Sequence, residues 1–355
     1  MIKELYVEGL NSKITETYQF NPDLNLLTGK NGSSKTTLLK LIWYANTGQF
    51  DNLIFEINFQ FLRLSTEKAT IEISRKKPDQ ITFKVNDAQP QIVPVRNIRL
   101  LDYRHPRMFK FINMIRELSV PTIFFPTFRR IEGGFSMNRN HEDRPFYGNS
   151  LKEAMNELSD RLTFANHKFI ASISTDDIVQ LLTAQFAEIS DRANQMQKQQ
   201  SDYIIEKIKN RKGDDATILT TIQTEFEATE KRRQELFKPF SVLAELIKKI
   251  FQHKGIKLSE ILTVGEVSEA IASDTLSAGE KQMLSFLCYN TFTKNSVIFI
   301  DEPELSLHPD WQRTLVPTLL QQGNNNQFFM ATHSPFIYSK YPDKEIILGQ
   351  DKGDN

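Results

Sequence analysis

The sequence lacks three features that would point to particular classes of protein. It has a single cysteine, Cys288, so no intrachain disulfide can form and a reducing, cytoplasmic setting is expected. No apolar run reaches about 18 residues and no secretory leader pattern opens the chain, so we expect no membrane span. An excess of charge of one sign is also missing, because 44 Lys and Arg residues balance 44 Asp and Glu residues. This balance argues against a general electrostatic attraction to nucleic acid or membrane.

The most hydrophobic run in the chain ends in two adjacent carboxylates. Residues 296–300 are mostly β-branched or aromatic and do not alternate with polar residues, which predicts a fully buried parallel strand. Asp301 and Glu302 follow directly. The carboxyl ends of strands in an open α/β sheet face the ligand crevice, so we expect these acids at the mouth of a site, where Mg²⁺ could balance their charge. The alternative is a pair of solvated acids in a turn before Pro303.

A second predicted strand, residues 24–27, runs into a loop of small residues and then into a helix. This order is the context of a phosphate loop, in which backbone N–H groups and a helix N-terminus surround phosphate oxygens. The residues expected to bind nucleotide are Gly29, Lys30, Asn31, Gly32, Ser33, Ser34, Lys35, Thr36 and Thr37. Lys35 would supply a point charge, and the Thr36 hydroxyl could ligate Mg²⁺. Ser34 replaces the usual glycine, which leaves a plain strand–helix turn as the alternative.

The region between residues 54 and 95 alternates between apolar and polar residues, which predicts an antiparallel meander that includes a strand over 54–59. A further buried strand is predicted over 122–126. Arg129 and Arg130 come soon after it and could meet phosphate or a partner's carboxylate, or else lie in a solvated turn.

From about residue 135 onward, helical periodicity replaces the strand patterns. The apolar stripes predict a helical hairpin that turns at 211–215. We expect it to be short, too brief for a long coiled-coil arm, and to form an inserted subdomain.

Two further signals lie in the last third of the chain. Ser277 with Glu280 three residues later is a capping box, so a helix should begin at Ala278. Gly279 leaves its first turn bare, which predicts a second anion site beside a free serine hydroxyl. His333 follows a predicted core strand and could hydrogen-bond a γ-phosphate or an attacking water. Each signal taken alone is more often structural.

In this order, the four motifs resemble those of ATP-binding-cassette ATPases. Gly29–Thr36 resembles the Walker A loop, 276–282 the signature motif, 297–302 the Walker B strand with its catalytic glutamate, and His333 the switch histidine. The long separation of Walker A and signature suits the soluble branch that includes structural-maintenance-of-chromosomes and RecF-like proteins. Residues 126–132 and 304–309 look closer to the small ATPases of bacterial anti-phage systems, such as the Septu-type and retron-associated ATPases.

The resemblance implies an α/β fold of the P-loop NTPase type, with a mixed sheet, an antiparallel β-subdomain and an inserted helical hairpin. Its expected domains are an N-terminal ATPase part over 1–134, a helical insertion over 135–254 and a C-terminal ATPase part over 255–355. The implied ligands are ATP and Mg²⁺, with Asp301 and Thr36 at the metal, Glu302 as general base and His333 at the γ-phosphate. The chain would form a homodimer or a higher even oligomer. Each ATP would then meet the signature residues of another subunit, which are Ser277, Ala278, Gly279 and Glu280.

The resemblance also implies a partner. The overcoming-lysogenization-defect nucleases share this ATPase but continue into a Toprim domain, whereas only 22 residues follow His333. We therefore expect a separate effector in anti-phage defence, an HNH or Toprim nuclease or retron components. Two alternatives stay open, a RecF-type DNA-repair or chromosome-binding ATPase that clamps nucleic acid, and a nucleotide-sensing scaffold with little turnover. Ser34 and the lack of a clear Q-loop glutamine leave magnesium coordination open.

Overall fold

The computed structural model describes residues 1–77, 80–94, 106–127, 129–131, 147–173, 175–209, 215–252 and 277–349. The chain divides into two compact units, the first formed by residues 1–172 and 293–355 and the second by 173–292. The boundaries expected near 134 and 254 lie outside the described residues. Among the helices in the described ranges, none is both long and apolar enough to cross a membrane.

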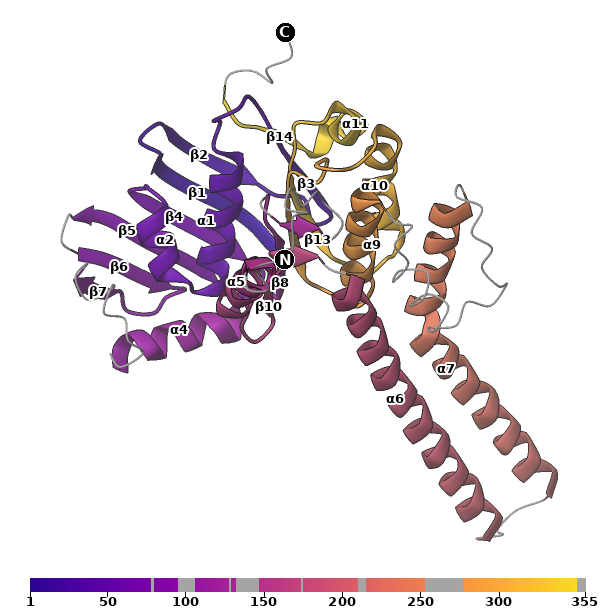
Figure 1. The fold of residues 1–355 in the computed structure, drawn as a ribbon. Helices are drawn as coiled ribbons and strands as arrows, with labels where there is room; N and C mark the ends of the chain where they lie inside the picture. The colour runs from indigo at the N-terminus through magenta and orange to yellow at the C-terminus, as the bar shows by residue number, and fades with distance from the viewer. Residues whose placement is uncertain are drawn as a thin grey trace. The chain divides into compact units, whose positions relative to one another are not determined.

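The first unit contains a parallel sheet (Figure 1). Its strands, in spatial order, are β10 (His167–Phe169), β8 (Thr122–Phe125), β12 (Val297–Asp301), β13 (Gln327–Ala331), β3 (Leu24–Thr28) and β14 (Glu345–Ile347). Every residue of β3, β12 and β13 is buried, as their predominantly hydrophobic sequences predict. Asp301, Ala331 and Leu27 pair across the three strands. The residues that follow these strands therefore emerge at one edge of the sheet.

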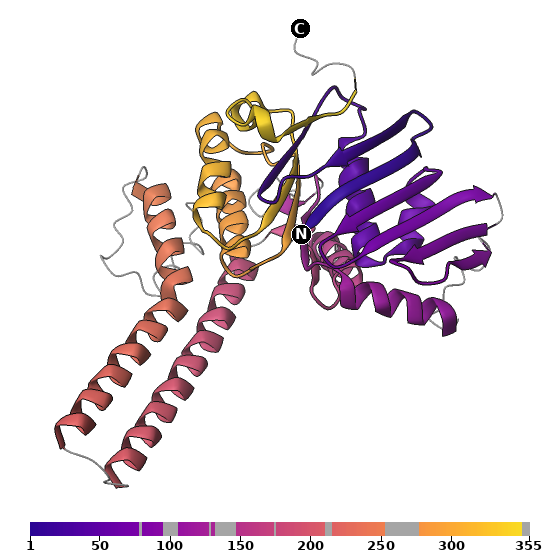
Figure 2. The ribbon, with the colours of Figure 1, turned by 180° about the vertical axis from the view of Figure 1, so that it is seen from behind.

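The second sheet of this unit is antiparallel and also has six strands (Figure 2). Their order is β2 (Ile14–Gln19), β1 (Ile2–Leu10), β4 (Phe61–Thr66), β5 (Thr70–Lys77), β6 (Gln80–Val85) and β7 (Gln91–Pro94). The expected antiparallel β-subdomain is confirmed, and the parallel and antiparallel strands lie in separate sheets.

The strand expected over 54–59 is wrong, because residues Phe50–Glu56 form the helix α2. Its buried residues are Phe50, Leu53 and Ile54, at the i, i+3, i+4 spacing of one helical face, whereas Phe55 is 44% exposed. The apparent alternation of apolar residues in this stretch therefore comes from the end of an amphipathic helix and the chain that follows it.

Helix α1 (Lys35–Thr47) packs against β12 and β13 of the parallel sheet and against β4 of the antiparallel sheet. Trp43, fully buried in α1, lies 5.0 Å from the Phe124 ring and donates a hydrogen bond to Thr122 Oγ1 at 3.0 Å. Thr122 also bonds His167 Nδ1 at 2.9 Å, and burial lowers the pKa of His167 to about 4. These contacts anchor the helix that carries the predicted phosphate loop.

The remaining elements of the first unit include α4 (Pro106–Leu118), α5 (Tyr147–Leu162), α10 (Pro309–Gln321), α11 (Pro335–Tyr338) and the short strand β9 (Arg130–Ile131). Strand β9 pairs with β11 (Ser172–Ile173). The expectation that strands end near residue 135 is wrong, because β10 lies at the edge of the parallel sheet beside β8. Three residues were too few to give a recognisable strand pattern.

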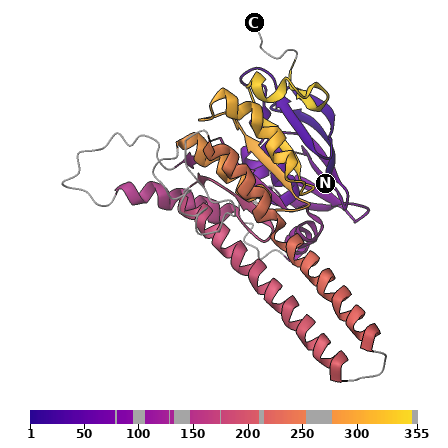
Figure 3. The ribbon, with the colours of Figure 1, turned by 90° about the vertical axis from the view of Figure 1, so that its right-hand side faces the viewer.

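The second unit is built on the helices α6 (Thr175–Lys209) and α7 (Asp215–Gln252), which form a hairpin (Figure 3). The expected hairpin is present, but the expectation that it is short is wrong. The helices have 35 and 38 residues, which corresponds to roughly 50 Å or more each. Gln200 Nε2 of α6 donates to the Glu225 carbonyl of α7 at 3.3 Å, which links the two helices. Helix α9 (Ala278–Thr291) packs against both.

Candidate active site

The predicted phosphate loop joins β3 to α1, and two glycines shape it. Gly29 has a φ of 133°, and a Cβ there would lie 2.3 Å from the Leu348 carbonyl oxygen, so only glycine fits. Gly32 has a φ of 79°, and a Cβ there would meet nothing within 4 Å. Around Gly32, the Ser33 N–H donates to the Lys30 carbonyl at 3.1 Å. The loop is thus tightly packed at its first glycine and bare at its second.

Lys35 is curled into this loop. Its Nζ donates to the Gly29 carbonyl at 2.8 Å and to the Lys30 carbonyl at 3.1 Å. Burial lowers the pKa of Lys35, and the nearby Glu302, Asp301 and Glu304 act in the opposite direction. The Lys35 ammonium also donates to Ser33 Oγ at 3.5 Å. These acceptors are all uncharged oxygens, so the ammonium can exchange them for phosphate oxygens, which carry charge and bond more strongly.

Ser34 is the N-cap residue of α1, but its side chain does not cap the helix. Its backbone is left-handed, with a φ of 75°, and its Oγ accepts a 2.7 Å hydrogen bond from Asn11 Nδ2. Asn11 lies in the turn between β1 and β2. The hydroxyl is therefore directed away from the backbone N–H groups of the first turn, which leaves those groups without a cap from Ser34. A helix start of this kind favours an anion.

Asp301 ends β12 and is 1% exposed. Its Oδ1 accepts from the Thr36 hydroxyl at 3.0 Å, and its Oδ2 accepts from the Thr127 hydroxyl. Burial raises the pKa of Asp301, and the two hydroxyl hydrogen bonds oppose that shift. A buried carboxylate beside a threonine hydroxyl has the hard oxygen donors that Mg²⁺ prefers, so Asp301 and Thr36 fit the expected metal ion. Thr127, which follows β8, was not anticipated.

Arg129 is 7% exposed and holds the backbone of the two acids. Its Nη1 donates to the carbonyls of Pro126 at 2.9 Å and Asp301 at 2.7 Å, and its Nη2 donates to the Glu302 carbonyl at 2.9 Å. Burial lowers the pKa of Arg129 to about 10, so it is still a cation at neutral pH. The structure places this guanidinium on backbone carbonyls, where we expected phosphate or a partner's carboxylate. The side chain of Arg130 lies outside the described residues.

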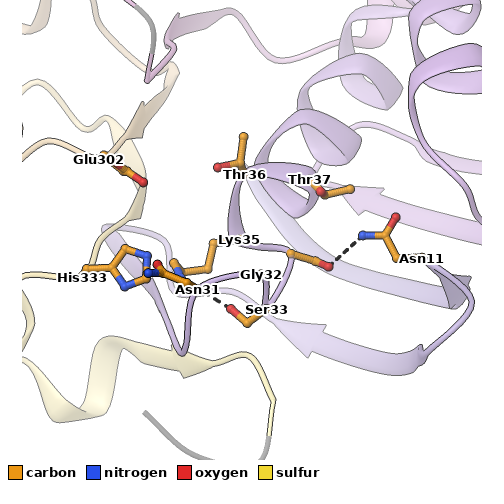
Figure 4. A pocket seen from close by; sticks show the side chains of 10 residues that line it. Asn11, Asn31, Gly32, Ser33, Lys35, Thr36, Thr37, Glu302 and His333 are labelled. Carbon is orange, nitrogen blue, oxygen red and sulfur yellow. Dashed lines mark hydrogen bonds between the residues drawn. The ribbon is translucent and has the colours of Figure 1, made fainter. Parts of the chain in front are cut away.

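Glu302 follows β12 with a left-handed backbone, at a φ of 48°, although it is not glycine and precedes Pro303. This conformation costs about 1–2 kcal/mol. Its N–H donates to the Ala331 carbonyl at 2.8 Å, and Arg129 holds its carbonyl. The strained backbone is thus fixed from both sides. It turns the Glu302 side chain away from the core and toward the loop (Figure 4).

These groups surround one cavity of about 360 Å³ (Figure 4). Its lining residues are Asn11, Asn31, Gly32, Ser33, Ser34, Lys35, Thr36, Thr37, Glu302 and His333. His333, exposed after the end of β13, lies beside Asn31 on the side of the cavity that carries Glu302. Gly29 and Lys30 do not line the cavity but accept hydrogen bonds from the Lys35 ammonium through their carbonyl oxygens. The sequence motifs at 29–37, 301–302 and 333 therefore converge, and Asn11 is an additional member.

The start of α9, in the second unit, shows the expected capping box. Ser277 Oγ accepts from the Glu280 N–H, and Glu280 Oε2 accepts from the Ser277 N–H at 2.7 Å. The helix begins at Ala278, as predicted, and Gly279 is buried. The expected free serine hydroxyl is wrong, because Ser277 Oγ also donates to Glu280 Oε2 at 2.7 Å. A ligand at this helix start would have to replace the cap. Leu276 lies outside the described residues.

The arrangement around the cavity supports phosphate chemistry. Backbone N–H groups at a helix start, a lysine ammonium and the bare Gly32 suit a chain of phosphate groups. Glu302 stands opposite them, as a base that activates water must. Two partners of the site residues, Thr127 and Glu304, were missed from the sequence because their hydrogen bonds join residues far apart in the chain.

Comparison with known proteins places this site in a family. The model of the family described as "AAA domain, putative AbiEii toxin, Type IV TA system" matches residues 24–339. The "Retron Vc95 probable ATPase" of Vibrio cholerae serotype O1 biovar El Tor is 22% identical over 356 residues, which cover 91% of this chain and 68% of the relative.

Two shorter matches cover 21% of this chain each. The "Retron Ec83 probable ATPase" of Escherichia coli is 34% identical over 86 residues, 16% of its length. The "Endonuclease GajA" of Bacillus cereus (strain VD045) is 33% identical over 79 residues, 14% of its length. The chain thus corresponds to only a small part of these two relatives.

Among solved structures, the Smc head bound to the C-winged helix domain of ScpA aligns with a TM-score of 0.46 at 12% identity, covering 99% of this chain and 95% of that one. The recombination mediator protein RecF aligns with a TM-score of 0.36 at 13% identity, covering 95% and 94%.

Proposed function

The chain belongs to the family of AAA domains described as putative AbiEii toxins of type IV toxin–antitoxin systems, and from this premise we propose that it binds ATP and hydrolyses it to ADP and phosphate. The observation that carries the proposal is that Lys35, Thr36, Glu302 and His333 line the same cavity. It joins a phosphate-binding loop to a carboxylate and an imidazole that come from two neighbouring strands.

The loop would bind the triphosphate. Lys35 would leave the carbonyls of Gly29 and Lys30 and donate to phosphate oxygens, while the uncapped N–H groups at the start of α1 bind the others. Thr36 and Asp301 would hold Mg²⁺, which neutralises charge on the phosphates and the leaving group when it is bound. Burial of Asp301 supports this role, because a bound cation offsets the desolvation cost of a carboxylate that is removed from water.

Glu302 would act as the general base. As the water oxygen bonds to the γ-phosphorus, its proton passes to the Glu302 carboxylate, and the bond from the γ-phosphorus to the bridging oxygen breaks to release ADP. His333 would hydrogen-bond a γ-phosphate oxygen and so distinguish ATP from ADP. The fixed backbone of Glu302 supports its assignment, because strain of this kind persists where the surrounding structure holds a functional group in place.

We place this site in a dimer. His333 is exposed and Glu302 is half-buried, so the cavity needs a cover that excludes water during reaction. The resemblance to ATP-binding-cassette ATPases supplies one, since the signature helix of a partner subunit would approach the γ-phosphate with its Ser277. ATP would then hold two chains together, and hydrolysis would release them.

The names of the relatives support a role in anti-phage defence. Two of them are retron probable ATPases, and one is an endonuclease. The ATP-dependent dimer would control a separate effector, for which a nuclease of HNH or Toprim type or the components of a retron are the candidates. Co-purification of the chain with the product of a neighbouring nuclease or reverse transcriptase gene, with and without ATP, tests this part.

The central test compares two variants of the cavity. Glu302→Gln keeps the shape of the side chain but removes the base, so phosphate release should fall by about 10²–10⁴-fold while ATP binding persists and the dimer accumulates. Glu56→Gln is the matched control, because Glu56 accepts a bond from the Tyr44 hydroxyl and does not line the cavity. Wild-type turnover by Glu302→Gln would show that the base is assigned wrongly.

A further inference from the structure

A second glutamate, Glu304, follows β12 two residues after Glu302, and its carboxylate bonds Thr332 and His333, which follow β13. Building on the proposed ATPase function, we infer that Glu304 is a positioning residue that fixes His333 relative to Glu302, so that the group that senses the γ-phosphate and the group that activates water are set by one side chain.

Glu304 uses both carboxylate oxygens on the residues after β13. Its Oε1 accepts from the His333 backbone N–H at 2.6 Å, and its Oε2 accepts from the Thr332 hydroxyl at 2.9 Å. Hydrogen bonds to a charged acceptor are the stronger class, worth about 1.5–3 kcal/mol each. The two bonds join a turn that begins at Glu302 to a loop 29 residues later in the chain.

His333 depends on such support because its own side chain is exposed. Its neighbours Thr332 and Ser334 are buried, and the Thr332 N–H donates to the Leu27 carbonyl of β3 at 3.0 Å. The Ser334 N–H donates to Thr332 Oγ1 at 3.0 Å. Thr332 is therefore held on the β3 side by its backbone and on the Glu304 side by its hydroxyl. The backbone of His333 is held by Glu304.

The turn that carries Glu304 is itself rigidly attached. The Leu305 N–H donates to the Glu302 carbonyl at 3.2 Å, and the Leu307 N–H donates to the Glu304 carbonyl at 3.0 Å. Gln312 of α10 donates to the Leu307 carbonyl at 2.8 Å and also bonds the Ser334 hydroxyl. A displacement of His333 is thus transmitted through Glu304 to the turn that begins at Glu302, rather than being absorbed by a flexible connection.

The chemistry of the residue favours a positioning role over simple packing. Glu304 is partly buried within a few residues of Asp301 and Glu302, where a third negative charge repels the other two. An apolar side chain would avoid this repulsion and fill the same space. Only a carboxylate offers two acceptors of fixed spacing for an amide N–H and a hydroxyl.

The test is a double-mutant cycle on turnover. Glu304→Ala should lower kcat by about 10²-fold, the effect of roughly 1 Å of misplacement in an active site, and should leave ATP affinity within about twofold of wild type. Glu304→Gln keeps one acceptor and should give a smaller loss. In a His333→Ala background, Glu304→Ala should lower kcat by less than about threefold, because its effect passes through His333.

Glu72→Ala is the control for removing a carboxylate from the same unit, since Glu72 pairs with Arg63 on the antiparallel sheet at 2.7 Å; its kcat should match wild type. Thr332→Val, which removes one of the two donors to Glu304, keeps the test informative if Glu304→Ala fails to fold. An equal loss of kcat with and without His333 would overturn the inference, and so would a loss of ATP affinity that matches the loss of kcat. If the wild type binds no ATP and releases no phosphate, both the proposed function and this inference are wrong. If the wild type is active but the effects of Glu304→Ala and His333→Ala on kcat are additive, only this inference is wrong.

Discussion

Helices α1 and α9 each have a serine at the N-cap, and these two serines behave in opposite ways. Ser34, before α1, has a left-handed φ of 75°, and its Oγ accepts a hydrogen bond from Asn11 Nδ2 instead of capping its helix. Ser277, before α9, has an extended backbone with a φ of −69° and forms a complete capping box with Glu280. One helix start is left open for a ligand, and the other is closed by its own side chains.

The difference shows what makes a helix start a binding site. Both helix starts have backbone N–H groups and a positive dipole end. Only the start of α1 has, in addition, an uncapped first turn, a lysine ammonium and a facing carboxylate. A ligand at the start of α9 would therefore have to displace the capping box. Binding of this kind suits a contact that forms and breaks during the nucleotide cycle.

Of the changes that distinguish the two helix starts, removal of Lys35 should have the largest effect on ATP binding. Lys35→Ala removes the lysine ammonium from the lining of the cavity. We expect ATP affinity to fall by at least about 10–100-fold, which corresponds to the loss of one or more charge-assisted hydrogen bonds. Titration with a fluorescent ATP analogue measures it. Lys40→Ala on the same helix is the control, because Lys40 pairs with Glu56 away from the cavity. Equal affinities for the two variants would contradict the site.

Blocking the other helix start should separate binding from turnover. Ser277→Arg removes the cap and fills the space proposed for the γ-phosphate of a partner subunit, so the variant should bind ATP but lose dimerisation and at least about 10²-fold of its turnover. Light scattering with ATP and phosphate release measure the two losses.

A mixture sharpens the test. Lys35→Ala and Ser277→Arg chains in one dimer place both lesions in one site and leave the other site intact, so activity that each variant lacks should return in part. A wild type that hydrolyses ATP as a monomer at high protein concentration would rule out the composite site.

Asp301, which accepts a hydrogen bond from Thr36 at the start of α1, should lower the stability of the nucleotide-free protein although it serves the proposed function. Burial raises the pKa of Asp301, so ionising this carboxyl costs more in the folded protein than in the unfolded chain, and the native state loses stability as the pH rises through that pKa. Asp301→Asn should therefore raise the melting temperature of the nucleotide-free protein at neutral pH by a few degrees, since about 1 kcal/mol shifts it by roughly 2–4 °C. The gain should vanish in acid, below the ordinary pKa of about 4. Scans at several pH values check it, and a lower melting temperature at neutral pH would contradict the role of burial.

The smallest expected effects are those of the two serines on stability, and they should differ in sign. Ser277→Ala removes a cap and should cost about 1 kcal/mol of unfolding free energy. Ser34→Gly removes a left-handed serine and should leave stability unchanged or raise it by up to about 1 kcal/mol, with ATP affinity preserved or increased. Urea unfolding measures both. A large loss of affinity in Ser34→Gly would show that the hydroxyl binds phosphate.

Much of this site could be predicted from the sequence because its residues directly follow strands with strong patterns. The run at 297–300 is uniformly apolar, the run at 24–27 is apolar except for Asn25, and the capping box at Ser277 is a local signal. What escaped prediction depends on contacts between distant residues. Thr127 bonds Asp301 across 174 residues, and nothing near Thr127 in the sequence marks it.

The errors also have local causes. Residues 54–59 alternate in composition, yet Phe50, Leu53 and Ile54 place one face of a helix in the core. The hairpin is longer than expected because most described side chains of α6 between 190 and 206 are polar and exposed, so the helix continues without the apolar stripe by which it was recognised. Arg129 was identified from its charge, but its guanidinium lies on three carbonyls that only the folded chain brings together.

The pairing of Asp301, Ala331 and Leu27 in one row has a consequence for how this protein can vary. Glu302 lies one residue beyond the end of β12 and His333 lies two residues beyond the end of β13, so their locations depend on the number of residues in those strands. One inserted residue would advance the chain by about 3.3 Å and turn every later side chain of that strand to the opposite face. Hydrophobic exchanges at Phe299 that keep its volume should be tolerated, whereas a single insertion in β12 should abolish activity. The number of residues in these strands, more than their identity, is what evolution has to preserve.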